Sequence, residues 1–153
     1  MEQDRMSTEE IVALYRPEIE KLLPYISWLQ QKEGQRTANI YEGDGIKDTS
    51  ITFPVYDGTL LNFIKTIEKT KLVNRNYVYT YARKQIHSAK DEKRLIKLAT
   101  VKDMNILQDI LSNYVIKGRT KGSMWSVGVE NGVYLDILMK MRELVEFWDK
   151  PIV

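Results

Sequence analysis

The chain has 153 residues, of which 43% are hydrophobic, and a formal net charge of +2. This length fits one domain, which buries enough surface to fold without a disulfide or a structural metal. With no cysteine and only one histidine, the sequence excludes a disulfide framework, a thiol nucleophile and a zinc site built from cysteine or histidine. No apolar stretch reaches the roughly 20 residues of a membrane helix, and the N-terminus lacks the apolar core of a signal peptide. We therefore expect a cytoplasmic protein without membrane contact.

Residues 7–33 predict two N-terminal helices. Ser7 and Glu10 have the spacing of a capping box, which opens a helix. We expect that helix to stop before Pro17, because the residue preceding a proline avoids the helical conformation. Pro17 can then open a second helix. Pro24 should kink or split that helix, because proline removes a backbone hydrogen bond.

Residues 37–55 have a different character. β-Branched and aromatic residues flank a Gly/Asp-rich turn at 42–45, which is typical of a β-hairpin. Pro54 limits the second strand to an edge or an end. Since an isolated two-stranded ribbon is marginally stable, we expect the hairpin to pack on helices.

Residues 57–148 predict a helical body. Asp57, Ser88 and Thr100 have the side chains and positions of helix N-caps. Residues 77–83 fit either a strand, by alternation of the tyrosines, or a helix, by four-residue spacing; we favour the helix. No repeat or linker interrupts the chain. The sequence thus predicts one domain over residues 1–153, a mainly α (α+β) multi-helix fold with one small hairpin.

The segment Lys117-Gly118-Arg119-Thr120-Lys121-Gly122-Ser123 is the strongest candidate site. Its glycines allow close approach of the backbone to a ligand, three cations converge, and a helix start at Ser123 offers free amides and a positive dipole end. It is not a P-loop, because the required lysine is absent and the spacing is one residue short. The segment predicts binding of a phosphate, a nucleic-acid backbone or an acidic partner; the alternative is an interhelical turn with solvated lysines.

Trp125 follows this segment by two residues. If exposed, it could stack a base or anchor a protein interface; if buried, it packs with Val129 and the last helix. The candidate ligand- or partner-binding set is Lys117, Arg119, Lys121, Ser123 and Trp125.

The middle of the chain is basic and rich in tyrosine. Proteins that bind single-stranded nucleic acid combine cations along the backbone with aromatic rings under the bases. The candidate nucleic-acid contacts are Arg75, Tyr77, Tyr81, Arg83 and Lys84, together with the basic run at 90–97. No signature of a known nucleic-acid-binding fold accompanies them, and a solvated basic surface is the alternative.

Catalytic sets are sparse. His87, the residue type most used for acid–base chemistry, has no partner at a recognisable spacing. A site of carboxylates alone stays open for magnesium or calcium, and an acid–base pair would need two carboxyl groups with separated pKa values. We expect no enzyme and no cofactor.

Short motifs between residues 50 and 142 resemble an uncharacterised bacterial domain-of-unknown-function family. The family brings no established activity, so the resemblance implies a shared fold only. Thr120 stands where the family usually has an aromatic residue. The motifs are Phe53-Pro-Val-Tyr-Asp57, Leu61-x-Phe63-Ile64, Leu72-Val73, Ile110-Leu-x-x-Tyr114, Gly118-Arg119, Gly122-Ser-Met-Trp125, Val129-Glu130-x-Gly132 and Leu135-x-x-Ile-Leu138.

The sequence is most consistent with a non-catalytic binding or regulatory protein that recognises a protein partner or a small anionic ligand, as a monomer or homodimer. Mobile elements often encode small proteins of this type as inhibitors or adaptors, and we take that role as a hypothesis. The alternatives are a nucleic-acid-binding protein and an enzyme with a carboxylate or phosphate site.

Overall fold

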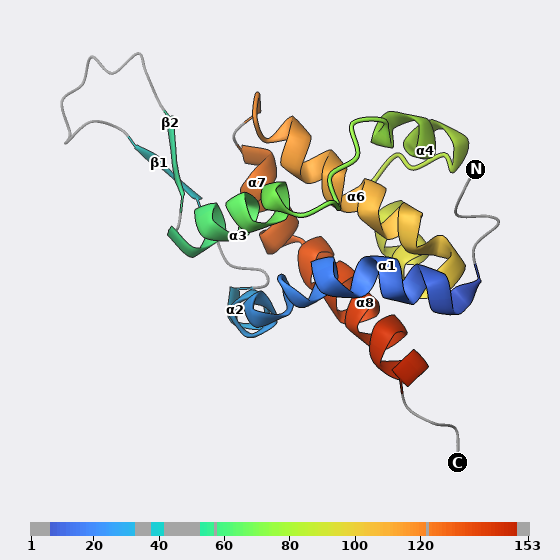
Figure 1. Ribbon diagram of the computed structural model, residues 1–153. Coiled ribbons are helices and arrows are strands. Elements are labelled where there is room, and N and C mark those ends of the chain that lie inside the picture. Colours follow the sequence, from blue (N-terminus) through green and yellow to red (C-terminus); the bar gives the residue numbers. More distant parts are fainter. Residues whose placement is uncertain (1–6, 33–37, 42–52, 57, 122, 150–153) are drawn as a thin grey trace.

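The computed structural model describes residues 7–32, 38–41, 53–56, 58–121 and 123–149, and their arrangement is shown in Figure 1. Helices dominate this part of the chain. In order they are α1 (Thr8–Glu20), the 3-10 turn η2 (Leu23–Tyr25), α2 (Ile26–Lys32), α3 (Gly58–Lys69), α4 (Tyr77–Arg83), α5 (Ala89–Leu98), the 3-10 turn η3 (Val101–Asp103), α6 (Met104–Lys117), α7 (Ser123–Glu130) and α8 (Val133–Asp149).

Helices α6 and α8 form the centre of the domain. Ten of the 14 residues of α6 are buried, since α3, α4, α5, α7 and α8 all pack around it. A helix that neighbours pack on most sides keeps only a narrow solvent face. α1, α2 and α5 cover other sides of α8. The apolar residues of all these helices therefore meet in one core.

A chain of aromatic rings crosses that core. Ring centroids are 5.1 Å apart between Tyr25 and Phe63, 5.2 Å between Phe63 and Tyr134, and 5.5 Å between Tyr134 and Tyr114. These tilted and edge-on geometries are the ones that aromatic quadrupoles favour. Gly128 makes room for the central ring, because a Cβ there would lie 2.4 Å from Cζ of Tyr134. The rings thus join η2, α3, α6 and α8.

The α+β class expected from the sequence is wrong: the packed domain is all-α. β1 (Ala38–Tyr41) and β2 (Phe53–Tyr56) are four-residue segments that pair antiparallel with each other, from Ala38 opposite Tyr56 to Tyr41 opposite Phe53. Neither packs extensively on a helix in the described part of the chain, and Figure 1 shows the pair at the outer edge, beyond α3.

The predicted hairpin is therefore not seen as a layer of the fold. The pattern of β-branched residues predicts only the local extended backbone. It does not show whether a helix has an apolar face left to cover, and here the helices bury their apolar faces against one another. The turn predicted at 42–45 lies outside the described residues.

The N-terminal helix starts as predicted but ends later. Ser7 Oγ accepts a hydrogen bond from the Glu10 amide, and Glu10 Oε1 accepts one from the Ser7 amide, both at 3.1 Å. The expected stop before Pro17 is wrong, because α1 runs through it to Glu20. Pro17 lies on the exposed side, where water can pair with the carbonyl that loses its partner, and Ile19 is fully buried. The split at Pro24 is confirmed, since Pro24 lies within η2, which separates α1 from α2.

Most of the other predicted helix boundaries are confirmed. Ser88 Oγ accepts from the Asp91 amide at 3.3 Å, and Thr100 forms a capping box with Asp103. Residues 77–83 are helical. Gly132, with φ of 80°, ends α7 in the left-handed conformation that glycine tolerates. Asp57 lies outside the described residues.

α4 ends in a Schellman motif that offers a stability test. The Ile86 amide donates to the Tyr81 carbonyl at 3.0 Å, and Gln85 between them has φ of 54°. Because a Cβ is strained there, we expect Gln85→Gly to raise the free energy of unfolding by about 0.5–1 kcal/mol in urea denaturation. Lys84→Gly, at a residue with φ of −92°, should lower it by a similar amount. Destabilisation by both variants would contradict the strain argument.

Candidate functional site

The segment 117–121 continues α6 as a series of turns. The amides of Gly118 and Lys121 donate to the carbonyls of Tyr114 and Lys117 at 3.0 and 2.8 Å. Those of Arg119 and Thr120 donate to Ile116 and Lys117, each at 3.2 Å. Carbonyls at the end of α6 therefore engage all four amides. The segment presents cationic side chains, but these four amides do not form an anion cradle.

The cations of this segment are exposed, and one is ion-paired. Arg119 donates from Nε and Nη2 to Glu68 Oε2 on α3, each at 3.0 Å. Lys117, Lys121 and Ser123 are exposed. Since an exposed ion pair contributes about 1 kcal/mol or less, an anion could compete with Glu68 for the guanidinium. Anion binding at 117–123 stays a prediction.

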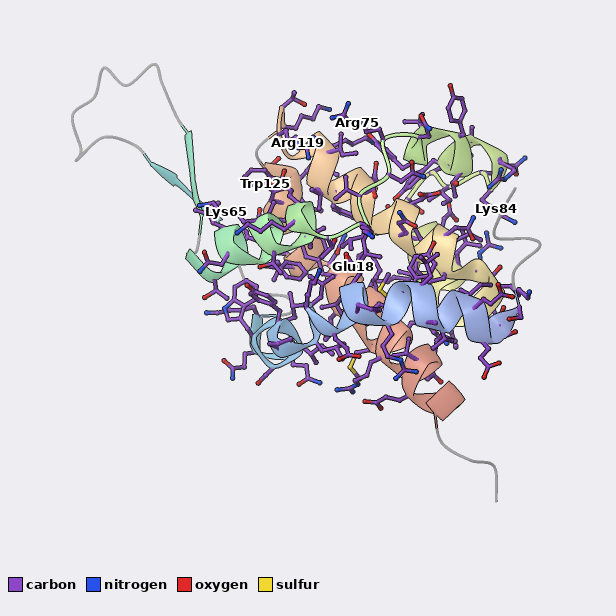
Figure 2. All side chains as sticks on the ribbon, in the orientation of Figure 1. Glu18, Lys65, Arg75, Lys84, Arg119 and Trp125 are labelled. Atoms are coloured by element: carbon purple, nitrogen blue, oxygen red, sulfur yellow. The ribbon has the colours of Figure 1, made fainter. Side chains whose placement is uncertain are left out.

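Trp125 packs against the end of α6. Its indole N–H donates to the Val115 carbonyl at 3.0 Å, and the side chain is half-buried. A Cβ on Gly118 would lie 1.9 Å from Trp125 Cδ1, so only glycine fits beneath the ring. Figure 2 shows Trp125 close to Arg119 at this end of the domain. These contacts favour a Trp125 that packs within the domain over one that stacks on a base.

The tyrosines of α4 divide between the core and the surface. Tyr77 is 7% exposed, and Tyr81 is half-buried with its ring edge-on to Tyr77 at 6.0 Å. Tyr79 is 69% exposed. The aromatic ring on the outer surface is thus Tyr79, which the candidate set omitted. The cations of the set (Arg75, Arg83 and Lys84) are exposed, and Figure 2 shows Arg75 and Lys84 near the two ends of α4.

Buried polar groups hold the start of α4 on α6. Asp109, 3% exposed, accepts hydrogen bonds from Thr80 Oγ1 at 2.5 Å and from Asn74 Nδ2 at 2.7 Å. Ser112 Oγ accepts from the Asn74 amide at 2.8 Å. Burial raises the pKa of the Asp109 carboxyl, while the bonds from Thr80 and Asn74 and the charge of Arg83 oppose that rise.

A second buried carboxylate connects α5 to α4 and α6. Glu92, 4% exposed, accepts from the hydroxyls of Tyr81 and Tyr114, each at 2.5 Å. Asn131 Nδ2 donates to the Tyr114 hydroxyl at 3.1 Å. Burial, and then the Glu92 carboxylate, raise the pKa of both phenols, so the two tyrosines stay protonated donors. Neutral hydroxyl groups thus donate hydrogen bonds to the Glu92 carboxylate inside the domain. This arrangement indicates a structural role for Glu92.

A hollow at the surface of the described residues was not predicted from the sequence. A cavity of about 630 Å³ lies between α5 and α8, and one of about 440 Å³ continues it past η3 to the start of α1. We call the two together the α5–α8 groove. Its apolar lining is Ile96, Ala99, Val101, Met139 and Leu144. Its charged lining is Lys93, Lys97, Lys102, Lys140, Arg142, Asp136, Glu143 and Glu146.

A weak sequence signal for the groove exists. Asp136, Lys140 and Glu143 recur at four- and three-residue spacing, so they share one face of α8. Such a charge pattern is usual for a solvent-exposed helix, which is why it did not indicate a site.

The described residues contain neither a metal-binding cluster nor a membrane-spanning helix. No three acidic or histidine side chains gather there to hold a metal ion. None of the helices described combines the length and apolar character needed to cross a bilayer. His87 is exposed, and its backbone amide donates to Asp91 Oδ2 at 2.9 Å.

The resemblance to a bacterial family over residues 50–142 stays a prediction. Comparison of the chain with protein-family models, with curated proteins and with solved structures finds no match.

Proposed function

We propose that the protein is a non-catalytic binding protein that recognises a partner protein in the α5–α8 groove. The observation that supports this most is that the two cavities of the groove are adjacent, since both are lined by Lys140 and Glu143 of α8. Concave surfaces are the usual places for recognition. An inhibitor or adaptor role is a further part of this hypothesis.

The dimensions of the groove suit a short helix. The residues of α8 that line it extend from Asp136 to Glu146, which corresponds to an axial length of about 15 Å, or three helical turns. Apolar side chains follow one another beneath it, from Met139 and Ile96 to Val101 and Leu144. An amphipathic helix places apolar residues at this spacing along one face.

The charges favour an acidic partner. Five cations and three carboxylates line the groove. Two of the carboxylates are already paired, Asp136 with Lys93 at 3.5 Å and Glu143 with Lys140 at 3.0 Å. The positive excess would attract acidic residues at the edges of a bound helix and would speed its association. We therefore propose an amphipathic helix with acidic flanks as the occupant.

The two buried acids, Glu92 and Asp109, are not placed to act on an occupant of the groove. Glu92 and Asp109 do not line the groove, and neutral hydroxyl or amide donors bond each of them. A carboxylate that takes a proton from a substrate must be within reach of it. Neither acid has that position relative to the groove.

Crosslinking followed by affinity measurement tests the proposal. A photoreactive residue at Glu146 would capture the partner in the source cells, and the purified partner would then be titrated against variants. We expect Met139→Arg to raise the Kd at least about 30-fold, the effect of removing about 2 kcal/mol at an interface centre. Val127→Arg, at an exposed residue on α7, is the matched control and should change Kd less than about twofold. A partner that binds Met139→Arg and the unmodified protein equally would contradict the groove as the site.

A further inference from the structure

A second surface, formed by α4 and the first turns of α5, has a separate chemistry. Residues 71–90 contain no aspartate or glutamate but five cations. Of these, Arg75, Arg83, Lys84 and Lys90 are exposed along α4, its connection to α5 and the start of α5. Exposed Arg94 lies one helical turn after Lys90, about 6 Å along α5. We call these five residues the basic track.

Two of the three acids near the basic track, Glu92 and Asp109, are buried beneath it. Glu92 points to the opposite side of α5, where it accepts from two tyrosines inside the domain. Asp109 lies beneath α4 and is 3% exposed. Asp91 accepts from the His87 amide and lies near Arg94. The outer surface of α4 therefore has a positive potential that an anionic chain would follow.

The exposed aromatic ring of α4 lies within the same surface. Tyr79 is 69% exposed, with Arg75 four residues before it, in the turn that precedes α4, and Arg83 one helical turn after it. Buried contacts hold the helix that carries it, through the bonds of Thr80 to Asp109 and of Tyr81 to Glu92. A ring on a fixed helix loses little freedom on binding, so its contact surface is pre-organised.

We propose that the basic track and Tyr79 bind single-stranded nucleic acid. The cations would contact successive phosphates, and the ring of Tyr79 would stack on a base between them. Proteins that bind single strands combine cations with aromatic rings in this way. A ring can stack on any base, because each base has a π face. The observations favour a strand over an acidic protein because one ring is flanked by cations on both sides along a convex helix.

Fluorescence anisotropy with labelled oligo(dT) and oligo(U) of about 15 nucleotides tests the proposal, at roughly 50–300 mM salt. If three to five phosphates are contacted, the logarithm of the association constant should fall with the logarithm of salt concentration with a slope of about −2 to −3.5. We expect Tyr79→Ala to weaken binding about 5- to 150-fold, and Tyr79→Phe to retain it. Arg94→Ala should weaken binding and reduce the slope by about 0.7.

Two charge-neutral variants serve as controls. Val127→Ala and Leu14→Ala, at exposed residues of α7 and α1, lie outside the basic track and should bind the oligonucleotides as the unmodified protein does. Absence of binding at the lowest salt would overturn the proposal. It would also be overturned if polyglutamate of equal length competed as well as oligo(dT) while Tyr79→Ala had no effect. That result would identify an acidic polypeptide as the ligand. Neither result bears on the partner captured through the groove.

Discussion

Replacing Tyr134 with alanine is expected to lower the free energy of unfolding by about 3–5 kcal/mol, the range for removal of a large buried side chain. Tyr134 is fully buried, and its ring lies between those of Phe63 and Tyr114. The space that it leaves cannot be filled from α7, because Gly128 has no side chain to move into it. Urea denaturation measures the loss, and calorimetry should show a melting temperature lower by about 6–20 °C.

Tyr134→Phe is the matched control for this prediction. Phenylalanine keeps the ring and its edge-on contacts, so we expect it to change the free energy of unfolding by less than about 1 kcal/mol. If alanine cost no more than phenylalanine, the aromatic chain would not be a main source of stability.

Glu92→Ala should have the second-largest effect, a loss of about 3–5 kcal/mol. The change leaves the buried hydroxyls of Tyr81 and Tyr114 without their acceptor, and hydrogen bonds to a charged group contribute about 1.5–3 kcal/mol each. It also leaves a cavity where α4, α5 and α6 meet. Because α4 loses an anchor, its amides should exchange with deuterium faster than those of α6.

Two further variants separate the hydrogen bonds from the charge. Glu92→Gln retains the size of the side chain and one oxygen acceptor, so we expect it to cost less than half as much as alanine. Glu146→Ala, on the exposed side of α8, should change the free energy of unfolding by less than about 0.5 kcal/mol. Equal losses for Glu92→Ala and Glu146→Ala would show that the two tyrosine bonds contribute little.

The sequence predicts well those features of the fold that a few neighbouring residues determine. The caps at Ser7, Ser88 and Thr100 each need one side chain and an amide three residues away, so their spacing is visible in the chain. The stop expected before Pro17 failed because burial of Ile19 in the core, a tertiary contact, offsets the local cost of proline. The α+β class failed for the same reason, since no local pattern tells whether a ribbon has helices to pack on.

In the candidate sites too, the sequence predicts the features that neighbouring residues determine and misses those that depend on tertiary contacts. The sequence located the turn between α6 and α7 correctly, but the direction of its amides depends on how the last turn of α6 closes. The helical state of residues 77–83 was predicted, yet the rotation of α4 that exposes Tyr79 follows from Asp109 and Glu92, which are distant in the chain. The α5–α8 groove needs two helices that are about 40 residues apart in sequence, so no spacing rule could find it.

The contact between Gly118 and Trp125 gives the protein an internal optical probe. The turn at 117–121 cannot shift without moving against the indole, whose N–H is bonded to Val115. The emission of Trp125 should therefore change when an anion or a partner displaces Arg119 from Glu68. Titration of inorganic phosphate with Trp28 and Trp148 replaced by phenylalanine would read that change from one ring, with no label attached to the turn.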